Sequence, residues 1–245
     1  MQSETSAAPS ATLPKIITVF NQKGGCAKTM TTMQVAGTLA HRGLKVLVAD
    51  VDPQNTSTLW SMTADEGTPF PASVVSFAAF QDRFVEKLLP VSTKYDVVVI
   101  DCPPALGSNV PWAALGIADL ALVPVIPVMD NVWASRAAED LILRNRELRA
   151  SMGNLTELKA AYLFSMVRRG NVFTECRKTL TENAQIPVLQ ESISMRNAFP
   201  ECQMFGCSVH SFGPSPAAKE VDAVVDRVID LIGLPVKKSK AKGKK

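Results

Sequence analysis

The sequence predicts a single α/β domain in which helices cover both faces of a doubly wound, mostly parallel β-sheet. Short, continuously apolar runs, typical of strands buried on both faces, alternate with stretches of helical periodicity. The chain has 245 residues, 47% of them hydrophobic, which is enough for one sizeable core. No internal repeat or mid-chain linker divides it. One domain is therefore expected over residues 15–235.

The first half of the chain starts this alternation. Runs of apolar and β-branched residues predict strands, and apolar residues spaced three or four apart predict helices. Segments rich in Gly, Pro and polar residues predict loops. In order, we expect a strand at 16–20, a helix at 28–41 closed by Gly43, a strand at 46–49, loops at 50–58 and 63–72, a helix at 77–89 and a strand at 97–100.

The second half continues the same order. Strands are expected at 120–126, 159–167 and 186–189, and helices at 131–149, 172–183 and 217–232. The last helix carries its apolar residues on one stripe, which suits either lipid or the face of a sheet. Packing on the sheet is the favoured interpretation, because surface helices of globular proteins commonly show such a stripe.

Composition excludes several classes of protein. The five cysteines, Cys26, Cys102, Cys176, Cys202 and Cys207, form no CxxC pair, and the chain has two histidines. A zinc site and a disulfide framework are therefore disfavoured, and a reducing cytoplasm is expected. The most apolar stretch, residues 117–129, is too short to span a membrane and contains Asp119.

The two ends of the chain differ in charge. Residues 1–14 are rich in Ser, Ala, Pro and Thr without a basic start, which predicts a disordered leader rather than a signal peptide. The formal net charge is +3, yet the last nine residues alone hold six lysines, so the rest is mildly acidic. We expect residues 236–245 to be a disordered basic tail that suits a polyanion such as nucleic acid.

The strongest motif is KGGCAKT at residues 23–29, between a predicted strand and a predicted helix. A glycine-rich turn that opens a helix directs several backbone N–H groups at one point, which favours a polyphosphate. Lys28 would reach the β- and γ-phosphates and Thr29 would bind Mg²⁺. The residues expected at the nucleotide are Gly24, Gly25, Cys26, Ala27, Lys28, Thr29 and Met30.

This loop departs from the plain pattern GxxxxGK[ST], because Gln22 and Ala27 stand at its two glycine positions. If position 27 requires a positive φ, alanine costs about 1 kcal/mol there. Nucleotide binding should survive, because the N–H of Ala27 remains. The effect on hydrolysis is left open.

Further motifs give the chain a family resemblance. The sequence reads NQKGG at 21–25, ADVDPQ at 49–54 and VVIDCPP at 98–104, and related patterns follow at 193–201 and 206–209. From Lys15 to about Leu234 it resembles the ParA/MinD family of deviant Walker A ATPases, which have the P-loop NTPase fold. Without a preceding helix-turn-helix domain it is most similar to the short, ParF-like partition ATPases.

The resemblance implies ATP and Mg²⁺ as cofactors and an ATP-bound homodimer. Lys23 corresponds to the signature lysine that reaches the partner subunit's phosphates, and Asp52 to the residue that positions the attacking water. With Lys28 these form the implied catalytic set. Thr29, Asp50 and Asp101 are the implied metal residues, although capping of a loop is an equally good role for Asp50.

The base pocket and the cysteines allow alternatives. Met166, Ser194 and Met195 occupy positions where the family encloses adenine, although methionines are more often ordinary core residues. Cys26 and Cys102 flank the nucleotide site, and related nitrogenase iron proteins bridge a cluster with cysteines. Residues 103–175 contain no cysteine, so a second ligand at suitable spacing is missing and a cluster is disfavoured.

ParA relatives bind DNA and MinD relatives bind membrane. MinD-type anchors end in an amphipathic segment, whereas residues 233–245 combine a helix break with lysines and almost no apolar residue. DNA is therefore favoured, and no stable membrane association is expected. A kinase would need a terminal tyrosine cluster, but the chain has only Tyr95 and Tyr162. The expected DNA-binding residues are Lys237, Lys238, Lys240, Arg168 and Arg169.

The sequence thus predicts a cytoplasmic, nucleoid-associated ATPase that is slow without its partner. It would dimerise on ATP, bind DNA without sequence preference and segregate a plasmid, a mobile element or a chromosome origin. The implied partner is a small centromere-binding protein of ParB or ParG type. The alternatives are a ParA-like ATPase that positions a protein cluster on the nucleoid and a MinD-like membrane switch.

Overall fold

The computed structural model describes residues 13–104, 108–153 and 156–235. Most of the expected leader and the whole expected tail lie outside this range, and so do Lys237, Lys238 and Lys240. Among the described residues, no helix is both long and apolar enough to cross a membrane.

A seven-stranded sheet forms the centre of the molecule, and every neighbouring pair of its strands is parallel. The strand order is β3-β2-β4-β1-β5-β6-β7. This confirms the predicted doubly wound sheet. The strands are β1 (Lys15–Val19), β2 (Val46–Asp50), β3 (Ser73–Ser76), β4 (Val97–Asp101), β5 (Leu120–Val125), β6 (Lys159–Val167) and β7 (Val188–Ser194).

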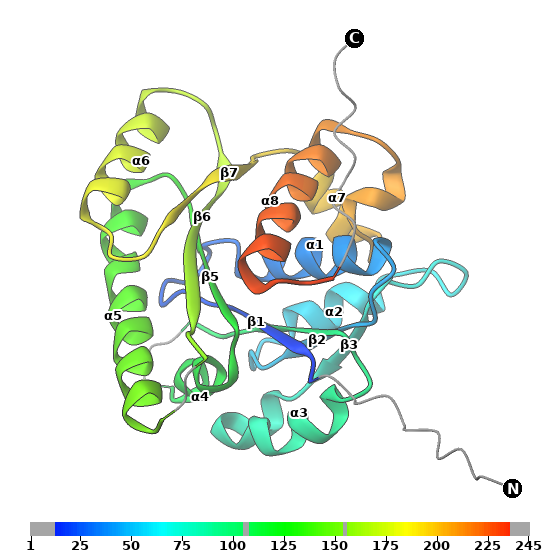
Figure 1. Cartoon of the computed structure of the whole chain (residues 1–245). Coiled ribbons are helices and arrows are strands. Elements are labelled where there is room, and N and C mark those ends of the chain that lie inside the picture. Colours follow the sequence, from blue (N-terminus) through cyan, green and yellow to red (C-terminus); the bar gives the residue numbers. More distant parts are fainter. Residues whose placement is uncertain (1–12, 105–107, 154–155, 236–245) are drawn as a thin grey trace, which may run out of the picture.

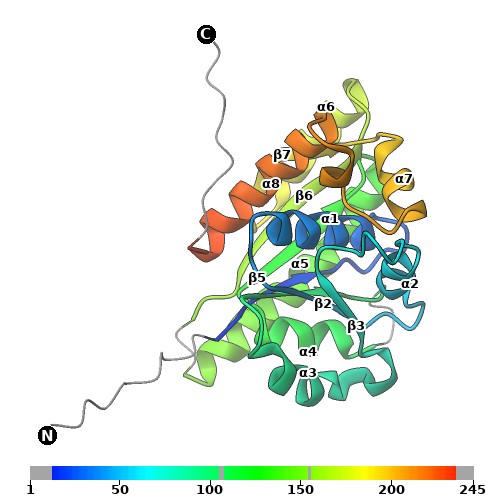
Figure 2. The same ribbon diagram turned by 90° about the vertical axis from the view of Figure 1, so that its right-hand side faces the viewer.

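Helices cover both faces of the sheet (Figures 1 and 2). Alternate strand residues point to opposite faces, so the buried side chains form two cores. One face carries α1 (Lys28–His41), α2 (Thr56–Met62), α7 (Ala198–Met204), α8 (Pro216–Ile232) and the 3₁₀ turn η2 (Val209–Phe212). The other carries α3 (Phe84–Ser92), α4 (Val110–Ile117), α5 (Met129–Ser151) and α6 (Asn171–Asn183).

The last helix packs on the sheet, as favoured from its sequence. The apolar stripe of α8 is buried in the core that it shares with α1 and β7, so it does not form a free lipid-binding face. Its start is capped by Ser215, whose hydroxyl accepts a hydrogen bond from the N–H of Ala218. It ends at Gly233, which adopts the left-handed conformation.

The structure corrects several local predictions. Residues 73–76 form the edge strand β3, which was not predicted because only two valines mark it in the sequence. The predicted helix at 77–89 is a 3₁₀ turn, η1 (Ala78–Arg83), followed by α3, with a break at Gln81 where φ is 49°. Three short helices, α2, α4 and α7, were not foreseen, and the strand expected at 186–189 runs over Val188–Ser194. Segments this short carry little periodicity, so their partners in space decide their conformation.

Parallel strands place all their carboxyl ends at one edge of the sheet. Asp50 and Asp101 are register partners at the last positions of β2 and β4, and Val19 pairs with Asp101 at the end of β1. The loop from β1 to α1 starts at this same edge. In an open α/β sheet such an edge is where ligands bind.

Candidate nucleotide site

The loop between β1 and α1 is wound by two residues of positive φ. Gly25 has a φ of 70°, and Ala27, which precedes α1, has φ 68° and ψ 27°. Position 27 therefore does require the left-handed conformation, and its alanine carries a cost of about 1 kcal/mol. The carbonyl of Ala27 accepts the N–H of Thr31 at 3.0 Å, so the helix begins at this strained residue.

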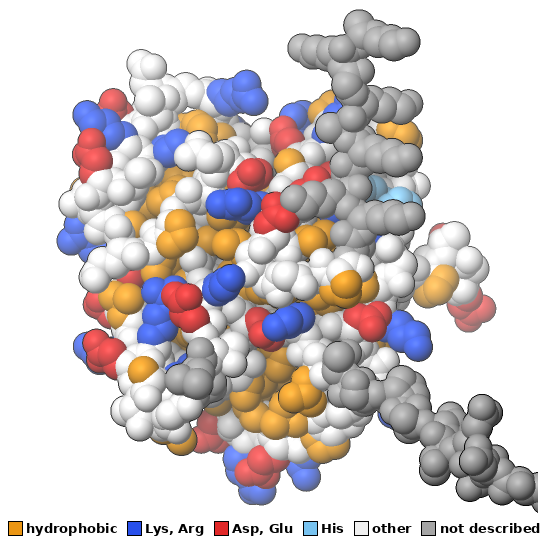
Figure 3. Space-filling view, viewed as in Figure 1, with side chains coloured by type: hydrophobic (Ala, Val, Ile, Leu, Met, Phe, Trp, Pro, Cys, Tyr) orange, Lys and Arg blue, Asp and Glu red, His pale blue; other side chains and the backbone are white. Residues whose placement is uncertain are grey.

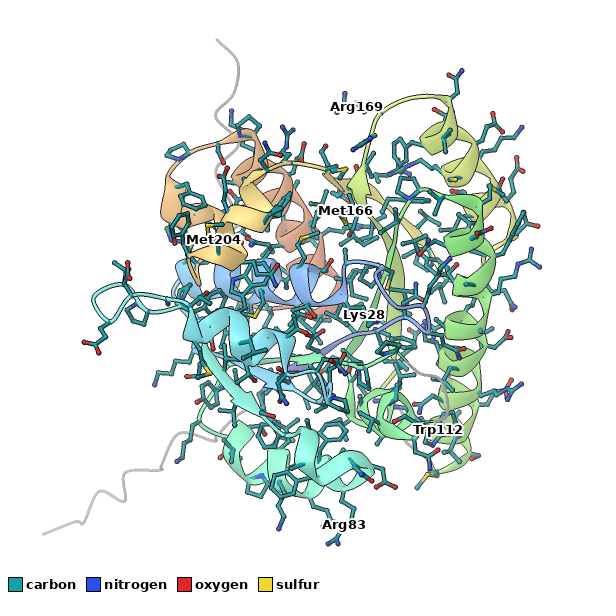
Figure 4. All side chains as sticks on the ribbon, turned by 180° about the vertical axis from the view of Figure 1, so that it is seen from behind. Lys28, Arg83, Trp112, Met166, Arg169 and Met204 are labelled. Carbon is teal, nitrogen blue, oxygen red and sulfur yellow. The ribbon has the colours of Figure 1, made fainter. Side chains whose placement is uncertain are left out.

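Lys28 is buried beneath this loop (Figure 4). Its Nζ donates to the carbonyl oxygen of Lys23 at 3.0 Å and lies 3.8 Å from the Sγ of Cys26. Burial raises the pKa of the Cys26 thiol, so the thiol stays protonated at neutral pH, and it donates to the same Lys23 carbonyl. These two partners of the Lys28 ammonium are uncharged, so its positive charge remains available to an anion in the loop.

A buried carboxylate stands at the opposite side of this loop. Asp101 is fully buried and accepts hydrogen bonds from the hydroxyls of Ser57 at 2.7 Å, Thr29 at 2.8 Å and Thr32 at 3.3 Å. Burial raises its pKa to about 7, against the lowering effect of Ser57 and Thr29. Carboxylate and hydroxyl oxygens are the ligands that Mg²⁺ prefers, so Thr29 and Asp101 fit a divalent cation beside the phosphates.

Asp50 and Asp52 have different surroundings. Asp50 accepts both the N–H and the hydroxyl of Thr58 at 2.9 Å, which ties the first turn of α2 to the end of β2. The capping role considered for Asp50 is therefore present in the structure. Asp52 lines the cavity described next, and its carboxylate accepts the N–H of Gln54 at 2.9 Å.

A cavity of about 450 Å³ extends from the phosphate loop toward α7. Its loop end contains most of the predicted phosphate residues, from Gly25 to Met30, together with Asp52. Its far end contains Met166 and Met195, which were predicted as base-pocket residues, beside further residues, four of which belong to the motif at 193–201. These additional lining residues are Thr56, Trp60, Pro104, Arg196, Asn197, Phe199, Pro200 and Gln203.

The far end of this cavity is held by a partly buried ion pair that the sequence did not predict. Glu220 of α8 accepts hydrogen bonds from the N–H and the hydroxyl of Ser194, both at 2.9 Å. It also accepts two from the guanidinium of Arg196, at 2.5 and 3.2 Å. Ser194 therefore faces Glu220 and is not one of the lining residues, whereas Arg196 lines the cavity. The spacing of 24 residues between Arg196 and Glu220 gave no signal in the sequence.

The remaining predicted residues lie outside this cavity. Gly24 and Lys23 are not lining residues, and the carbonyl of Lys23 holds the Lys28 ammonium. Arg168 and Arg169 follow β6 and line a second cavity, of about 710 Å³. Cys102 is fully buried behind the site, and burial raises its pKa well above the ordinary value. The described residues contain no group of three or more Cys, His, Asp or Glu side chains that could hold a metal ion.

Known proteins match this chain in sequence and fold. The carboxysome distribution protein A of Halothiobacillus neapolitanus is 29% identical, with 87% of this chain and 95% of that protein aligned. The chromosome partitioning protein ParA of Myxococcus xanthus is 29% identical over 47% of this chain and 53% of its own length. The Pyrococcus horikoshii septum site-determining protein MinD, solved with Mg-ADP, superposes with a TM-score of 0.65 at 17% identity, covering 93% of this chain and 99% of its own.

The family model that matches is the CobQ/CobB/MinD/ParA nucleotide binding domain, over residues 17–209. This range contains the phosphate loop, Asp52, Asp101 and the lining residues of α7. At 17% identity, the superposition on MinD supports the fold alone. The family model, however, matches most of the chain. This protein therefore belongs to the CobQ/CobB/MinD/ParA family of nucleotide-binding domains.

Proposed function

We propose that this protein is a Mg²⁺-dependent ATPase that switches between a monomer and an ATP-bound dimer. The observation that carries this proposal is a buried Lys28 that lines the cavity with uncharged hydrogen-bond partners, together with Thr29, which lines the same cavity and donates to the buried Asp101. The triphosphate would lie on the loop amides and Lys28. Mg²⁺, held by Thr29 and Asp101, would neutralise charge on the β- and γ-phosphates.

Asp52 and Lys23 complete the proposed chemistry. Asp52 lines the cavity and forms no ion pair within the described part of the chain, so its carboxylate could orient an attacking water. Lys23 lies outside the cavity of its own chain, which agrees with a role toward the phosphates of a second subunit. Dimerisation would then depend on ATP, because Lys23 has phosphates to contact in the second subunit only when that subunit has bound ATP.

The proposed work of the switch is to distribute a cargo along the nucleoid in the cytoplasm. Extensive alignment with a carboxysome distribution protein supports a protein assembly as the cargo. Similarity to a chromosome partitioning protein supports the second candidate, segregation of DNA through a centromere-binding partner. Non-specific DNA binding would involve Arg168, Arg169 and the lysines beyond residue 236. On the face seen in Figure 3, basic and acidic side chains are interspersed, so this face carries no continuous basic surface for DNA. This favours the tail lysines as the main DNA-binding residues.

Two lysine variants test the switch itself. Lys28→Ala should lose ATP binding, because Lys28 contacts the phosphates of the ATP bound to its own subunit. Lys23→Ala should bind ATP normally and fail to dimerise, because Lys23 contacts the ATP of the other subunit. Calorimetry with ATP and gel filtration with a non-hydrolysable analogue measure these two effects. A normal dimer of Lys23→Ala would contradict the role across the interface. Asp52→Ala should still dimerise but hydrolyse ATP slowly, and an unchanged rate would assign the water to another residue.

Removal of the tail tests DNA binding. If each of the six tail lysines contacts one phosphate, the slope of log K against log salt contains a contribution of about −5 from them. A chain ending at Leu234 should therefore bind DNA less tightly and with a flatter salt slope, while its ATP-dependent dimer stays intact. An equal slope for both chains would assign DNA binding to Arg168 and Arg169.

The neighbouring genes distinguish the two kinds of cargo. A gene for a shell protein would support a protein assembly, and a gene for a small DNA-binding protein would support segregation of DNA.

A further inference from the structure

Asn55, the residue before α2, has a backbone conformation that few residue types adopt. Its φ of 51° and ψ of 36° are left-handed, and asparagine is one of the few residues besides glycine that visit this region routinely. A residue in this position usually has an extended backbone and caps the helix with its side chain. The side chain of Asn55 forms no such cap, and it contacts other groups instead.

The backbone of Asn55 closes a tight turn that carries Asp52. The N–H of Asn55 donates to the carbonyl of Asp52 at 2.8 Å, and the carbonyl of Asn55 accepts the N–H of Leu59 at 2.8 Å. Within this turn, the carboxylate of Asp52 accepts the N–H of Gln54 at 2.9 Å. Asn55 therefore both ends the turn that orients Asp52 and precedes the first turn of α2.

The side chain of Asn55 ties this turn to the sheet. Its Nδ2 donates to the carbonyl of Pro53 at 3.1 Å, inside the turn. Its Oδ1 accepts a hydrogen bond from the hydroxyl of Ser76 at 2.5 Å. Ser76 is the last residue of β3 and the register partner of Asp50, so it lies at the carboxyl edge of the sheet. The edge strand that the sequence did not predict thus holds the turn that carries Asp52.

The start of α2 has anchors that do not involve Asn55. Thr58 donates its N–H and its hydroxyl to Asp50, and Ser57 donates its hydroxyl to Asp101. These bonds hold the helix at the sheet edge. Loss of the Asn55 side chain should therefore loosen the turn while α2 stays in place.

We propose that Asn55 is a positioning residue for Asp52, which it holds in the orientation that aligns the attacking water. A misplacement of about 1 Å in such a group can lower a rate about a hundredfold. The catalytic effect rests on the proposed function, which assigns the water to Asp52, whereas the rigidity of the turn does not. Asn55 is not a lining residue of the cavity, so it should affect turnover and leave ATP affinity unchanged.

Variants of Asn55 separate the backbone from the side chain. Asn55→Gly keeps the left-handed backbone and removes the side chain, and it should lower kcat about tenfold. Its KM, its ATP affinity in calorimetry and its ATP-dependent dimer in gel filtration should equal those of the parent. Asn55→Ala also strains the backbone, so its kcat should be lower still. A parent kcat for Asn55→Gly, or a loss of its ATP affinity equal to the loss of kcat, would overturn the proposal.

Variants of Ser76 test the link to the sheet. Ser76→Ala removes the hydroxyl that bonds to Asn55 and should lower kcat about threefold, whereas Ser76→Thr keeps a hydroxyl and should retain the parent rate. The matched control is Ser73→Ala, at the other end of the same strand, which should leave kcat unchanged. Equal rates for Ser76→Ala and Ser73→Ala would exclude β3 from the positioning of the turn.

A double-mutant cycle identifies the residue through which Asn55 acts. In the Asp52→Ala background, Asn55→Gly should cause no further loss of kcat, because the group that it positions is absent. If the two losses multiply, Asn55 acts independently of Asp52 and the proposal is wrong.

Amide exchange tests the turn without ATP. In the nucleotide-free chain, the amide proton of Gln54 should exchange with water at least about threefold faster in Asn55→Gly than in the parent, as measured by NMR, because its bond to Asp52 is opened more often. Equal exchange rates would overturn the positioning role. Faster exchange combined with a parent kcat for Asp52→Ala would instead contradict the role of Asp52 in the proposed function.

Discussion

The phosphate end and the far end of the nucleotide cavity are built by different means. The phosphate end comes from one continuous loop of residues 21–29 and two strand ends, and its polar groups are buried and hydrogen-bonded. The far end collects side chains from β6, β7 and α7, and it includes Met195, which is half exposed. Short-range geometry thus fixes the first end, and packing between distant segments fixes the second.

This difference predicts how each end responds to change. At the phosphate end, a substitution should alter nucleotide binding while the fold stays intact, because the loop is exposed to the ligand and anchored by the strong sheet. At the far end, a substitution should alter stability together with binding, since the wall exists only through contacts among α2, α7 and α8. Four substitutions test this contrast.

The largest effect is expected for Lys28→Ala at the phosphate end. It should lower ATP affinity by about a thousandfold, or about 4 kcal/mol, because the buried ammonium is lost from the loop. Calorimetry measures the affinity, and urea unfolding without nucleotide should show little change. A large loss of stability in Lys28→Ala would contradict the contrast between the two ends.

Gly206→Ala should be the most destabilising change at the far end. Gly206 has a φ of +58°, and a Cβ there would lie 2.1 Å from the N and 2.5 Å from the Cα of Ala64. Conformational strain and overpacking together should cost about 3 kcal/mol in the free energy of unfolding. Gly213→Ala is the matched control, because Gly213 has a φ of +75° but open space around it. If the two variants lose equal stability, the close contact of α2 with α7 contributes nothing.

Glu220→Gln should cost about 2 kcal/mol at pH 7, because it weakens charge-assisted bonds to Ser194 and Arg196. Although burial acts the other way, the hydrogen bonds from Arg196 and Ser194 lower the pKa of the Glu220 carboxyl. A lowered pKa stabilises the fold above the unfolded-state pKa, and this stability is lost as pH falls through the folded-state pKa. The difference in unfolding free energy between parent and variant should therefore shrink below about pH 4. A difference that stays constant down to pH 3 would exclude the ionised pair.

The smallest effect is expected for Ala27→Gly, back at the phosphate end. Relief of the left-handed strain should raise the free energy of unfolding by about 1 kcal/mol. A modest rise in ATP turnover should accompany it. Ala40→Gly, within the helical part of α1, should have the opposite sign, at about 1 kcal/mol less stable. A loss of stability in Ala27→Gly would mean that the loop has adapted to its alanine.

Much of the phosphate end could be predicted from sequence because its residues are neighbours in the chain. The run at 23–29 and the apolar strands that precede the loop, Asp50 and Asp101 are local patterns, and the parallel sheet follows from their alternation. Ala27 does adopt a positive φ, so the condition considered for position 27 is met. Of the three residues predicted to enclose adenine, Met166 and Met195 line the cavity, whereas Ser194 bonds to Glu220 and does not.

The sequence by itself determined the layered α/β fold, the phosphate loop and the family, because hydrophobic periodicity and contiguous motifs are properties of neighbouring residues. Only the tertiary structure decided the far wall of the cavity, the Arg196–Glu220 pair and the contact between the end of α2 and α7. Each of these joins segments far apart in the chain, and Thr63 and Gln203, which are hydrogen-bonded to each other, are 140 residues apart. Such contacts arise from the packing of short helices, and the sequences of these helices carry too little periodicity to predict either the helices or their contacts.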